Sequence, residues 1–324
     1  MKTKKIFIEW AEYGSRAASL AHAFGAKTFF IGKVNKHKNV LISFSTYPAK
    51  IIKNYKIIKE NRPAIVYITN TTWIIAFVNL LFSKIFKHKL ILDSHSCAFD
   101  HELIKYPLFL SKYFATKANL SIVTNLSHYN LLKNHGAETL IISDIPFEDK
   151  LAITEKIKMS EKFNICYVCT FATDEPYIEV FEAAKMNNNI KIYVTGNYNK
   201  VNINPENYSH ITFTGFCSNE KYKLYINSAD ALMTLTTREN TMQRAGSEAI
   251  SVGKPLITSD TKMLRNYFTE GTIFVKNTRK EINKGFDKMI LKFEELKKGI
   301  NILKEKRKKS FSETLEVLNK KLEE

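Results

Sequence analysis

The chain has 324 residues, 44% of them hydrophobic and 25% charged, which excludes a disordered or fibrous protein and predicts two domains of roughly 150 residues. The formal net charge is +17, and the first 150 residues hold most of the excess, with 21 lysine and arginine residues against 10 acidic ones. Such a charge attracts anions, but the lysines are dispersed, which argues against nucleic acid as a partner.

Short β-branched or apolar runs alternate with amphipathic stretches along the whole chain. This alternation predicts mainly parallel sheets with helices on both faces, an α/β class with two doubly wound, Rossmann-like domains. In the first half the predicted strands are Lys5–Glu9, Thr28–Ile31, Ala64–Ile68, Lys89–Asp93, Leu120–Thr124 and Thr139–Ile142. In the second half they are Asn164–Thr170, Ile190–Thr195, Ile211–Thr214, Ala231–Leu235, Pro255–Thr258 and Thr272–Val275.

The stretch from Ile145 to Lys158 loses this periodicity and is typical of a linker, so we expect one Rossmann-like domain over 1–148 and a second over 149–324, which includes the terminal helices. The charged tail from Lys280 has apolar residues at helical spacing and predicts two amphipathic helices, which can pack back on the first domain. Two such domains direct the carboxyl ends of their strands, and the loops that follow, toward a shared cleft between them. The chemistry is therefore expected in loops after strands.

The longest apolar run, Trp73 to Phe86, is too short and polar to span a membrane and predicts a packed helix. The basic, aromatic end of this segment, from Lys84 through Phe86, Lys87 and His88 to Lys89, suits peripheral contact with an anionic membrane. Four cysteines and no charged-then-apolar leader predict a cytoplasmic protein, peripheral at the inner face of the membrane if that contact forms. Cys166 and Cys169 lie within a predicted strand, which favours core cysteines over metal ligands.

The segment from Thr236 to Asp260 is the strongest candidate site. A strand ends at Leu235, a polar loop follows, a helix is expected to begin near Asn240 or Thr241, and Gly253-Lys254-Pro255 ends it. The free N–H groups and the positive dipole end of such a helix suit a diphosphate. The loop supplies further ligands and charges: Arg238, Thr241, Met242, Gln243 and Arg244.

Glu248 lies two turns into the expected helix. A carboxylate there can accept hydrogen bonds from the two adjacent hydroxyls of a ribose. The alternative is that Glu248 pairs with Arg244 at helical spacing while Glu239 interacts with the helix dipole.

This stretch resembles the donor-site signature of retaining glycosyltransferases of the GT-B fold and GT4 type, the glycosyltransferase group 1 family. That signature has an acidic residue, seven residues, a glutamate and an Ala-x-x-x-Gly-x-Pro close, which Glu248-Ala249 and Gly253-Lys254-Pro255 match. Glu239 is nine residues before Glu248, so Asn240 occupies the family's first acidic position. The resemblance implies that Glu239, through a one-residue shift, or Asn240 acts at the donor sugar.

Matches to the family extend over most of the chain. Gly215-Phe216 resembles the turn beside the nucleotide base, and Thr195-Gly196 resembles the preceding donor-side loop. In the first half, Leu90 to His95 is similar to the strand that ends beneath the transferred sugar, which implies a catalytic role for His95. The first loop, with Gly14, Ser15 and Arg16, is expected on the acceptor side, where Arg16 meets a phosphate or lies on a helix surface.

Two departures from the family pattern bear on mechanism. The Arg and Lys that many relatives place after the first strand of the second domain are missing, and residues 170–176 read TFATDEP instead. Phosphate binding would then depend on the helix start with Arg238, Arg244 or Arg16. There is also no Asp-x-Asp clamp, so we expect no metal and no cofactor, only a nucleotide-sugar co-substrate such as a UDP- or GDP-sugar.

The sequence thus predicts a metal-independent hexosyltransferase that moves a sugar from a nucleotide diphosphate to a glycan or a lipid-linked acceptor in surface polysaccharide assembly. The family resemblance implies retention of anomeric configuration, with the leaving phosphate oxygen accepting the acceptor proton. The alternatives are a non-catalytic binding protein with a degenerate GT-B donor site and a sugar-nucleotide epimerase on the same scaffold.

Overall fold

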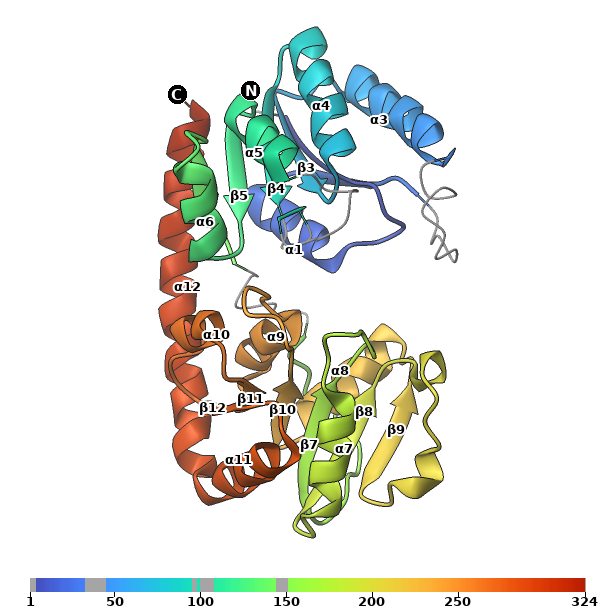
Figure 1. Cartoon of the computed structure of the whole chain (residues 1–324). Coiled ribbons are helices and arrows are strands. Elements are labelled where there is room, and N and C mark those ends of the chain that lie inside the picture. The colour runs from blue at the N-terminus through green and yellow to red at the C-terminus, as the bar shows by residue number, and fades with distance from the viewer. Residues whose placement is uncertain (1–3, 33–44, 95–97, 100–107, 144–150, 324) are drawn as a thin grey trace. The chain divides into compact units, whose positions relative to one another are not determined.

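The computed structural model describes residues 4–32, 45–94, 98–99, 108–143 and 151–323. The chain forms two compact units, Met1–Ile145 with Glu313–Glu324 and Pro146–Ser312. Each unit is built around one six-stranded sheet, and all strand pairs are parallel (Figure 1).

The sheet of the first unit has the strand order β2-β1-β3-β4-β5-β6. Its strands are β1 (Lys5–Glu9), β2 (Lys27–Phe30), β3 (Ile65–Asn70), β4 (Lys89–Ser94), β5 (Leu120–Val123) and β6 (Thr139–Ile141). The helices between them are α1 (Ser15–Phe24), α3 (Tyr47–Asn61), α4 (Trp73–Phe86), α5 (Leu108–Lys117) and α6 (Leu126–Lys133).

Helices α3, α4 and α5 cover one face of this sheet. The apolar cluster beneath them combines Ile6, Val66 and Leu90 from the strands with residues of all three helices, such as Ile58 and Phe82. Because successive strand residues point to opposite faces, Phe7 and Tyr67 lie on the other face, where Tyr67 packs against Phe24 of α1. The run from Trp73 to Phe86 is therefore the packed helix that its composition predicted.

The sheet of the second unit has the order β12-β11-β10-β7-β8-β9. Its strands are β7 (Phe163–Val168), β8 (Ile190–Thr195), β9 (Ile211–Gly215), β10 (Ala231–Thr234), β11 (Leu256–Ser259) and β12 (Thr272–Val275). Its helices are α7 (Tyr177–Lys185), α8 (Asn219–Ser228), α9 (Arg244–Val252), α10 (Lys262–Tyr267) and α11 (Arg279–Leu291), with short 3-10 turns η2 (Tyr198–Lys200) and η3 (Pro205–Asn207).

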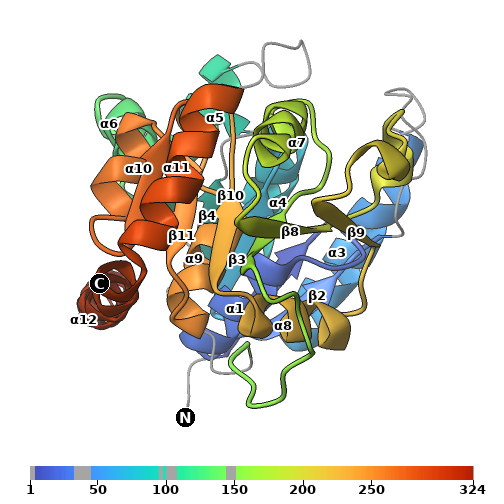
Figure 2. The ribbon, with the colours of Figure 1, turned by 90° about the horizontal axis from the view of Figure 1, so that it is seen from below.

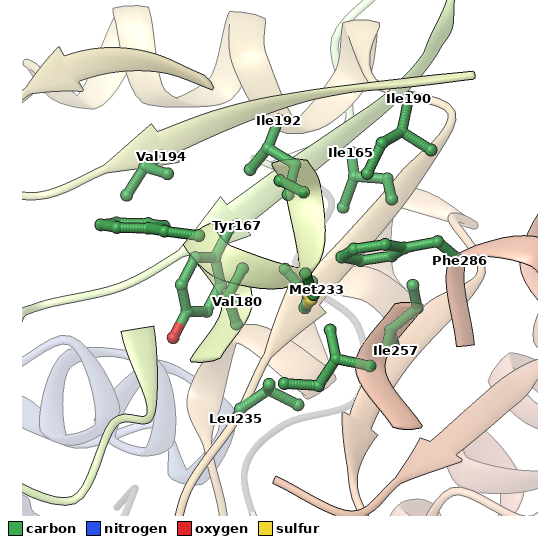
Figure 3. Close-up of a cluster of buried hydrophobic side chains, with 14 of the residues drawn as sticks. Ile165, Tyr167, Val180, Ile190, Ile192, Val194, Met233, Leu235, Ile257 and Phe286 are labelled. Atoms are coloured by element: carbon green, nitrogen blue, oxygen red, sulfur yellow. The ribbon is translucent and has the colours of Figure 1, made fainter. Parts of the chain in front are cut away.

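The largest apolar cluster of the second unit lies between this sheet and helices α7 and α11 (Figure 2). Figure 3 shows Ile165, Tyr167 and Met233 from β7 and β10 packed with Val180 of α7 and Phe286 of α11. All five side chains are fully buried. The opposite face packs against α9 and the final helix α12 (Phe293–Glu323), through residues such as Ile250 and Ile300.

All twelve predicted strands are present, with bounds within two residues of the expected ones, and α11 and α12 are the two predicted terminal helices. The last residues of α12 belong to the first unit, as the fold prediction anticipated. Lys5 Nζ contacts Asn319 Oδ1 at 3.4 Å, and Lys89 Nζ donates to the Leu322 carbonyl at 2.8 Å. Within the described ranges, no helix is both long and apolar enough to cross a membrane.

Cys166 lies in β7 and Cys169 directly after it, and both side chains are buried in the core of the second unit. Burial raises the pKa of both thiols well above its ordinary value. Both are core cysteines, as their strand context predicted.

His88, between α4 and β4, gives a testable pH dependence. Its side chain is buried, neither ring nitrogen has a hydrogen-bond partner among the described residues, and burial lowers its pKa to about 4. Between that pKa and its ordinary value near 6.5, the unfolded chain binds a proton that the folded chain does not. The stabilisation that comes from keeping His88 neutral and buried is therefore complete above pH 6.5. As the pH falls from 6.5 toward 4, the free energy of unfolding decreases by about 2–3 kcal/mol.

The fluorescence of the only two tryptophans, Trp10 and Trp73, reports unfolding of the first unit. Urea unfolding followed by this signal should show a lower free energy of unfolding at pH 5 than at pH 7.5 in the wild type, and a much smaller difference in His88→Gln. The exposed His22→Gln is the control and should keep the wild-type difference between the two pH values. If His88→Gln showed the same pH dependence of unfolding as the wild type, His88 would not be its source.

Candidate functional site at the carboxyl edge of the second sheet

The strand order of the second unit locates a ligand-binding edge. The chain runs from β7 outward through β8 to β9, then returns to β10 beside β7 and continues outward through β11 to β12. The crossovers on either side of the β7–β10 pair therefore run in opposite directions. Such a switch point leaves a crevice at the carboxyl ends of the two strands, which is where ligands bind in open parallel sheets. The relevant loops are residues 169–176 and 235–243.

The acidic residues of the first loop hold that loop together. Glu175 Oε2 accepts hydrogen bonds from the backbone N–H groups of Thr170 at 2.8 Å and Ala172 at 2.9 Å. It also accepts from the Thr170 hydroxyl at 3.0 Å. The carboxylate therefore replaces the missing backbone partners of a tight turn, which explains why this loop carries an acidic side chain.

Asp174 joins the first loop to the second. Its Oδ2 accepts from the Thr236 hydroxyl at 2.8 Å, and its backbone carbonyl accepts from the N–H of Thr237 at 2.8 Å. Its Oδ1 lies 3.6 Å from Nη2 of Arg238, whose side chain is 55% exposed. Arg238 is thus a half-exposed cation whose loop is attached to the neighbouring loop by a carboxylate.

Helix α9 begins at Arg244, so the predicted start near Asn240 or Thr241 is wrong. Gln243 is its N-cap residue in an extended conformation, and its side-chain amide donates to the Leu235 carbonyl at 2.6 Å. This bond links the helix start to the end of β10 while Gln243 itself stays extended. Gln243 makes no side-chain cap bond to the helix, so its first N–H groups are not capped by that residue.

Three polar oxygens lie buried around the first turn of α9. They are Thr241 Oγ1, Gln243 Oε1 and Ser247 Oγ, and none has a hydrogen-bond partner within the described part of the chain. Buried polar groups are normally hydrogen-bonded in native proteins, so such a group of oxygens needs an explanation. Met242, between the first two, packs against the apolar cluster under α9.

Glu248 lies one turn after the start of α9. The sequence predicted two turns, because it placed the helix start four residues too early. Its Oε1 accepts from Arg244 Nε at 3.1 Å, the helical pairing weighed from the sequence, and its Oε2 accepts from the hydroxyl of Tyr222 in α8. Burial, reinforced by the negative charge of Glu248, raises the pKa of Tyr222 well above its ordinary value, so its hydroxyl stays protonated. An ionised carboxylate has about four lone-pair sites. Glu248 can therefore accept hydrogen bonds from ribose hydroxyls while it keeps those from Arg244 and Tyr222.

The remaining donor-loop residues have distinct positions. Glu239 Oε1 accepts from the backbone N–H of Lys262, the first residue of α10, at 2.7 Å. Its carboxylate therefore interacts with the dipole of α10, not with that of α9. Asn240 is half-buried in the turn before α9.

The chain turns at Gly196 and Gly215, and the backbone around Gly196 leaves no room for a side chain. Gly196, after β8, has φ +101°, and a Cβ there would lie 2.0 Å from the Cys169 carbonyl oxygen. Gly196 N–H also donates to the Gly215 carbonyl at 3.1 Å, which brings the ends of β8 and β9 together. Thr195 is buried beside it, whereas Phe216 is 88% exposed. An aromatic ring so exposed at a strand's carboxyl end can stack on a planar ligand.

In the first unit, the structure corrects the expectation for Arg16. Its side chain is neither on a helix surface nor available as an exposed cation, because it is buried against Asp93 of β4. Arg16 Nη2 donates to Asp93 Oδ1 at 2.9 Å and to the Ile142 carbonyl at 2.8 Å. Arg16 therefore ties α1 to the carboxyl ends of β4 and β6.

Gly14 is the N-cap residue of α1, and Ser15 is its first residue. A Cβ on Gly14 would lie 1.6 Å from Glu9 Oε2, so glycine at this position leaves room for the Glu9 carboxylate. His95, predicted to be catalytic, lies outside the described residues.

Sequence reasoning missed four residues that hold the site. Asp174 and Tyr222 are two of them. The others are Ser259, whose hydroxyl accepts from Thr236 N–H at 2.9 Å, and Asn277, whose side-chain amide donates to the Thr236 carbonyl at 2.8 Å. Ser259 ends β11 and Asn277 follows β12 by two residues, so polar residues at strand ends were a usable signal.

Comparisons with known proteins bear on the family and the fold of the chain. Residues 150–307 match the family described as glycosyl transferases group 1. No curated protein sequence matches the chain.

Among solved structures, sucrose-phosphate synthase from Thermosynechococcus elongatus is 12% identical with a TM-score of 0.74, over 98% of each chain. HepE from Anabaena in complex with UDP-glucose is 14% identical with a TM-score of 0.71, over 98% of this chain and 99% of that one. A protein from Listeria monocytogenes described as a UDP-N-acetylglucosamine 2-epimerase is 10% identical with a TM-score of 0.62, over 93% and 91%.

The expected fold, with two Rossmann-like domains, is thereby confirmed across nearly the whole chain. Residues 150–307, which contain the switch-point loops and α9, match the glycosyl transferases group 1 family.

Proposed function

We propose that the protein transfers a hexose-type sugar from a nucleotide diphosphate to a glycan or lipid-linked acceptor, with retention of configuration. The observation that carries this proposal is the group of ligand-type atoms at one sheet edge: a helix start whose N-cap side chain does not cap it, three buried oxygens with no hydrogen-bond partner among the described residues, a buried carboxylate and an exposed aromatic ring. The family match over the same residues and the UDP-glucose complex of HepE support it.

Each part of the donor has a complementary group in this proposal. The diphosphate lies at the start of α9, where N–H groups, Arg238 and Arg244 compensate its charge. The ribose hydroxyls donate to Glu248, which Tyr222 and Arg244 hold in place. The base stacks on Phe216 beside the Gly196–Gly215 turn.

The transferred sugar is assigned to Asn240 on the donor side, and His95 keeps the catalytic role that the family resemblance implies. Because the Glu239 carboxylate already accepts from the first N–H of α10, we assign the first acidic position of the signature to Asn240. Catalysis then depends mainly on stabilising the departing diphosphate through the helix start and the two arginines, since charge develops there in the transition state.

A thermal-shift panel of UDP, GDP, ADP, TDP and CMP tests the donor site. A nucleotide present at about 100 times its Kd stabilises the folded protein by about 2.7 kcal/mol. We expect one nucleotide, UDP or GDP, to stabilise the wild type and to fail on Glu248→Ala. The exposed Glu206→Ala is the matched control and should respond like the wild type.

The absence of any shift in the wild type would instead favour the non-catalytic binding protein with a degenerate donor site. A full shift in Glu248→Ala would contradict the ribose assignment. An epimerase on the same fold would convert one UDP-sugar into its epimer without an acceptor, which chromatography of the products would reveal.

A further inference from the structure

The outer side of α4 exposes a row of large apolar side chains. Phe77, Leu81 and Ile85 follow one another at intervals of four residues, which places them on one side of the helix, and they are 42%, 44% and 63% exposed. Scattered surface residues of this kind are ordinary, but three in a row on one helix are not.

The neighbouring helices extend this row into a surface. Phe109 and Tyr113 of α5 and Ile52 of α3 are each more than half exposed. Ring contacts join neighbouring helices. The ring centres of Phe77 and Phe114 of α5 are 5.9 Å apart, and those of Tyr55 of α3 and Phe86 of α4 are 5.3 Å apart. Figure 1 shows α3, α4 and α5 next to one another. We call Ile52, Phe77, Leu81, Ile85, Phe109 and Tyr113 the outer apolar surface.

Lysines accompany this surface, and acidic residues are nearly absent. Helices α3, α4 and α5 together contain seven lysines and one acidic residue, Glu60. Lys59 Nζ lies 5.8 Å from the ring centre of Tyr55, and Lys117 Nζ lies 5.5 Å from that of Tyr113. Their flexible stems can follow the apolar rings while the ammonium groups reach outward.

We propose that the outer apolar surface docks on an anionic lipid bilayer. Its apolar side chains enter the boundary between headgroups and acyl chains, and the lysines of α3, α4 and α5 contact lipid phosphates. An anionic bilayer offers both an apolar layer and negative charge above it. A second copy of the same surface would instead bring two strongly basic faces together, which like-charge repulsion disfavours.

This surface differs from the one expected from the sequence. Of the residues expected to make that contact, Lys84, Phe86, Lys87, His88 and Lys89, only Lys84 and Lys87 are exposed, and Ile85 between them belongs to the outer apolar surface. Phe86 packs against the cluster beneath the helices, His88 is buried and Lys89 is bonded to the Leu322 carbonyl. The residues that face outward are those one helical turn apart on α4, together with their neighbours on α3 and α5.

Docking through these helices would hold the first unit at the membrane, where a lipid-linked saccharide is found. This last step rests on the proposed glycosyltransferase function. The docking itself does not depend on it, because the contact involves only the outer side of the first unit.

Co-sedimentation of the full chain with vesicles tests the proposal. We expect the wild type to bind vesicles that contain phosphatidylglycerol and to bind phosphatidylcholine vesicles at least about tenfold less, with binding reduced at high salt. The triple variant Phe77→Ser, Leu81→Ser, Ile85→Ser should lose at least about tenfold in partitioning. The matched control is Ile178→Ser, Leu291→Ser, Ile302→Ser, which removes exposed apolar residues from the second unit and should bind as the wild type does.

Replacing Lys59, Lys84 and Lys117 with serine should also lower binding to anionic vesicles at least about tenfold, without affecting the tryptophan-detected unfolding of the first unit. The proposal is overturned if the triple apolar variant binds vesicles as the wild type does, or if the wild type binds none. Self-association that this variant abolishes, without vesicle binding, would instead make the surface a protein interface and overturn it. The nucleotide-induced thermal shift is measured separately, so its failure would reject the donor site, whereas vesicle binding alone decides whether this surface docks on lipid.

Discussion

Replacing Arg16 with methionine is expected to lower the free energy of unfolding of the first unit by about 3–5 kcal/mol. The side chain of Asp93 is fully buried, and its described partner Arg16 donates to both of its carboxylate oxygens, at 2.9 Å and 3.2 Å. Removing the guanidinium takes away these charge-assisted hydrogen bonds from a fully buried carboxylate, and breaking a buried ion pair is costly. The Ile142 carbonyl loses its donor in the same variant.

Urea unfolding followed by the fluorescence of Trp10 and Trp73 measures this loss in the first unit. The double variant Arg16→Met, Asp93→Leu should be more stable than Arg16→Met, because the buried carboxylate is removed together with its cation. Lys133→Met is the matched control: it breaks the exposed 3.9 Å pair with Glu138 and should cost less than about 1 kcal/mol. Equal losses in Arg16→Met and Lys133→Met would contradict the role assigned to this pair.

Replacing Arg238 with alanine is expected to lower kcat/KM for donor turnover by about 100-fold or more, with little change in thermal stability. Its half-exposed side chain contributes little to folding, and in the proposed site it is one of the two cations that compensate the diphosphate. The expected effect is large because the first loop supplies the carboxylates of Asp174 and Glu175 where relatives of the resembled family place a basic pair.

Asp174→Ala should lower both turnover and thermal stability, because Thr236 loses its acceptor and the loop that carries Arg238 is no longer held. Asp174→Asn keeps an oxygen for Thr236 and should retain most of the stability.

Turnover of the UDP- or GDP-sugar that the thermal-shift panel identifies measures the effect of both the Arg238 and the Asp174 variants. The exposed Arg279→Ala is the control for a lost charge in the same unit. Full activity in Arg238→Ala would show that other groups compensate the diphosphate.

The strands could be predicted because their information is local. Runs such as Lys5–Glu9, Ile190–Thr195 and Thr272–Val275 are apolar, bounded by turn residues and too far apart for hairpins, so pattern and spacing alone located them. The pairing of Arg244 with Glu248 was also accessible, since helical spacing brings residues four apart together.

The start of α9 and the fate of Arg16 were not predictable in this way. The helix does not begin before Arg244, because Gln243 is extended and its side chain is bonded to the Leu235 carbonyl, eight residues earlier. Arg16 is buried because Asp93, 77 residues later, comes to lie beside it in the folded sheet. Likewise, Tyr222 reaches Glu248 only because α8 packs against α9.

The sequence by itself thus determined the two α/β sheets, the strand positions and the segment that carries the candidate donor site, because periodicity and turn chemistry act over a few residues. Only the tertiary structure decided which charges are neutralised internally, which loops are joined and which apolar side chains of α3, α4 and α5 remain outside. Those outcomes depend on groups brought together across long sequence separations, where burial makes charge and hydrogen-bond pairing decisive.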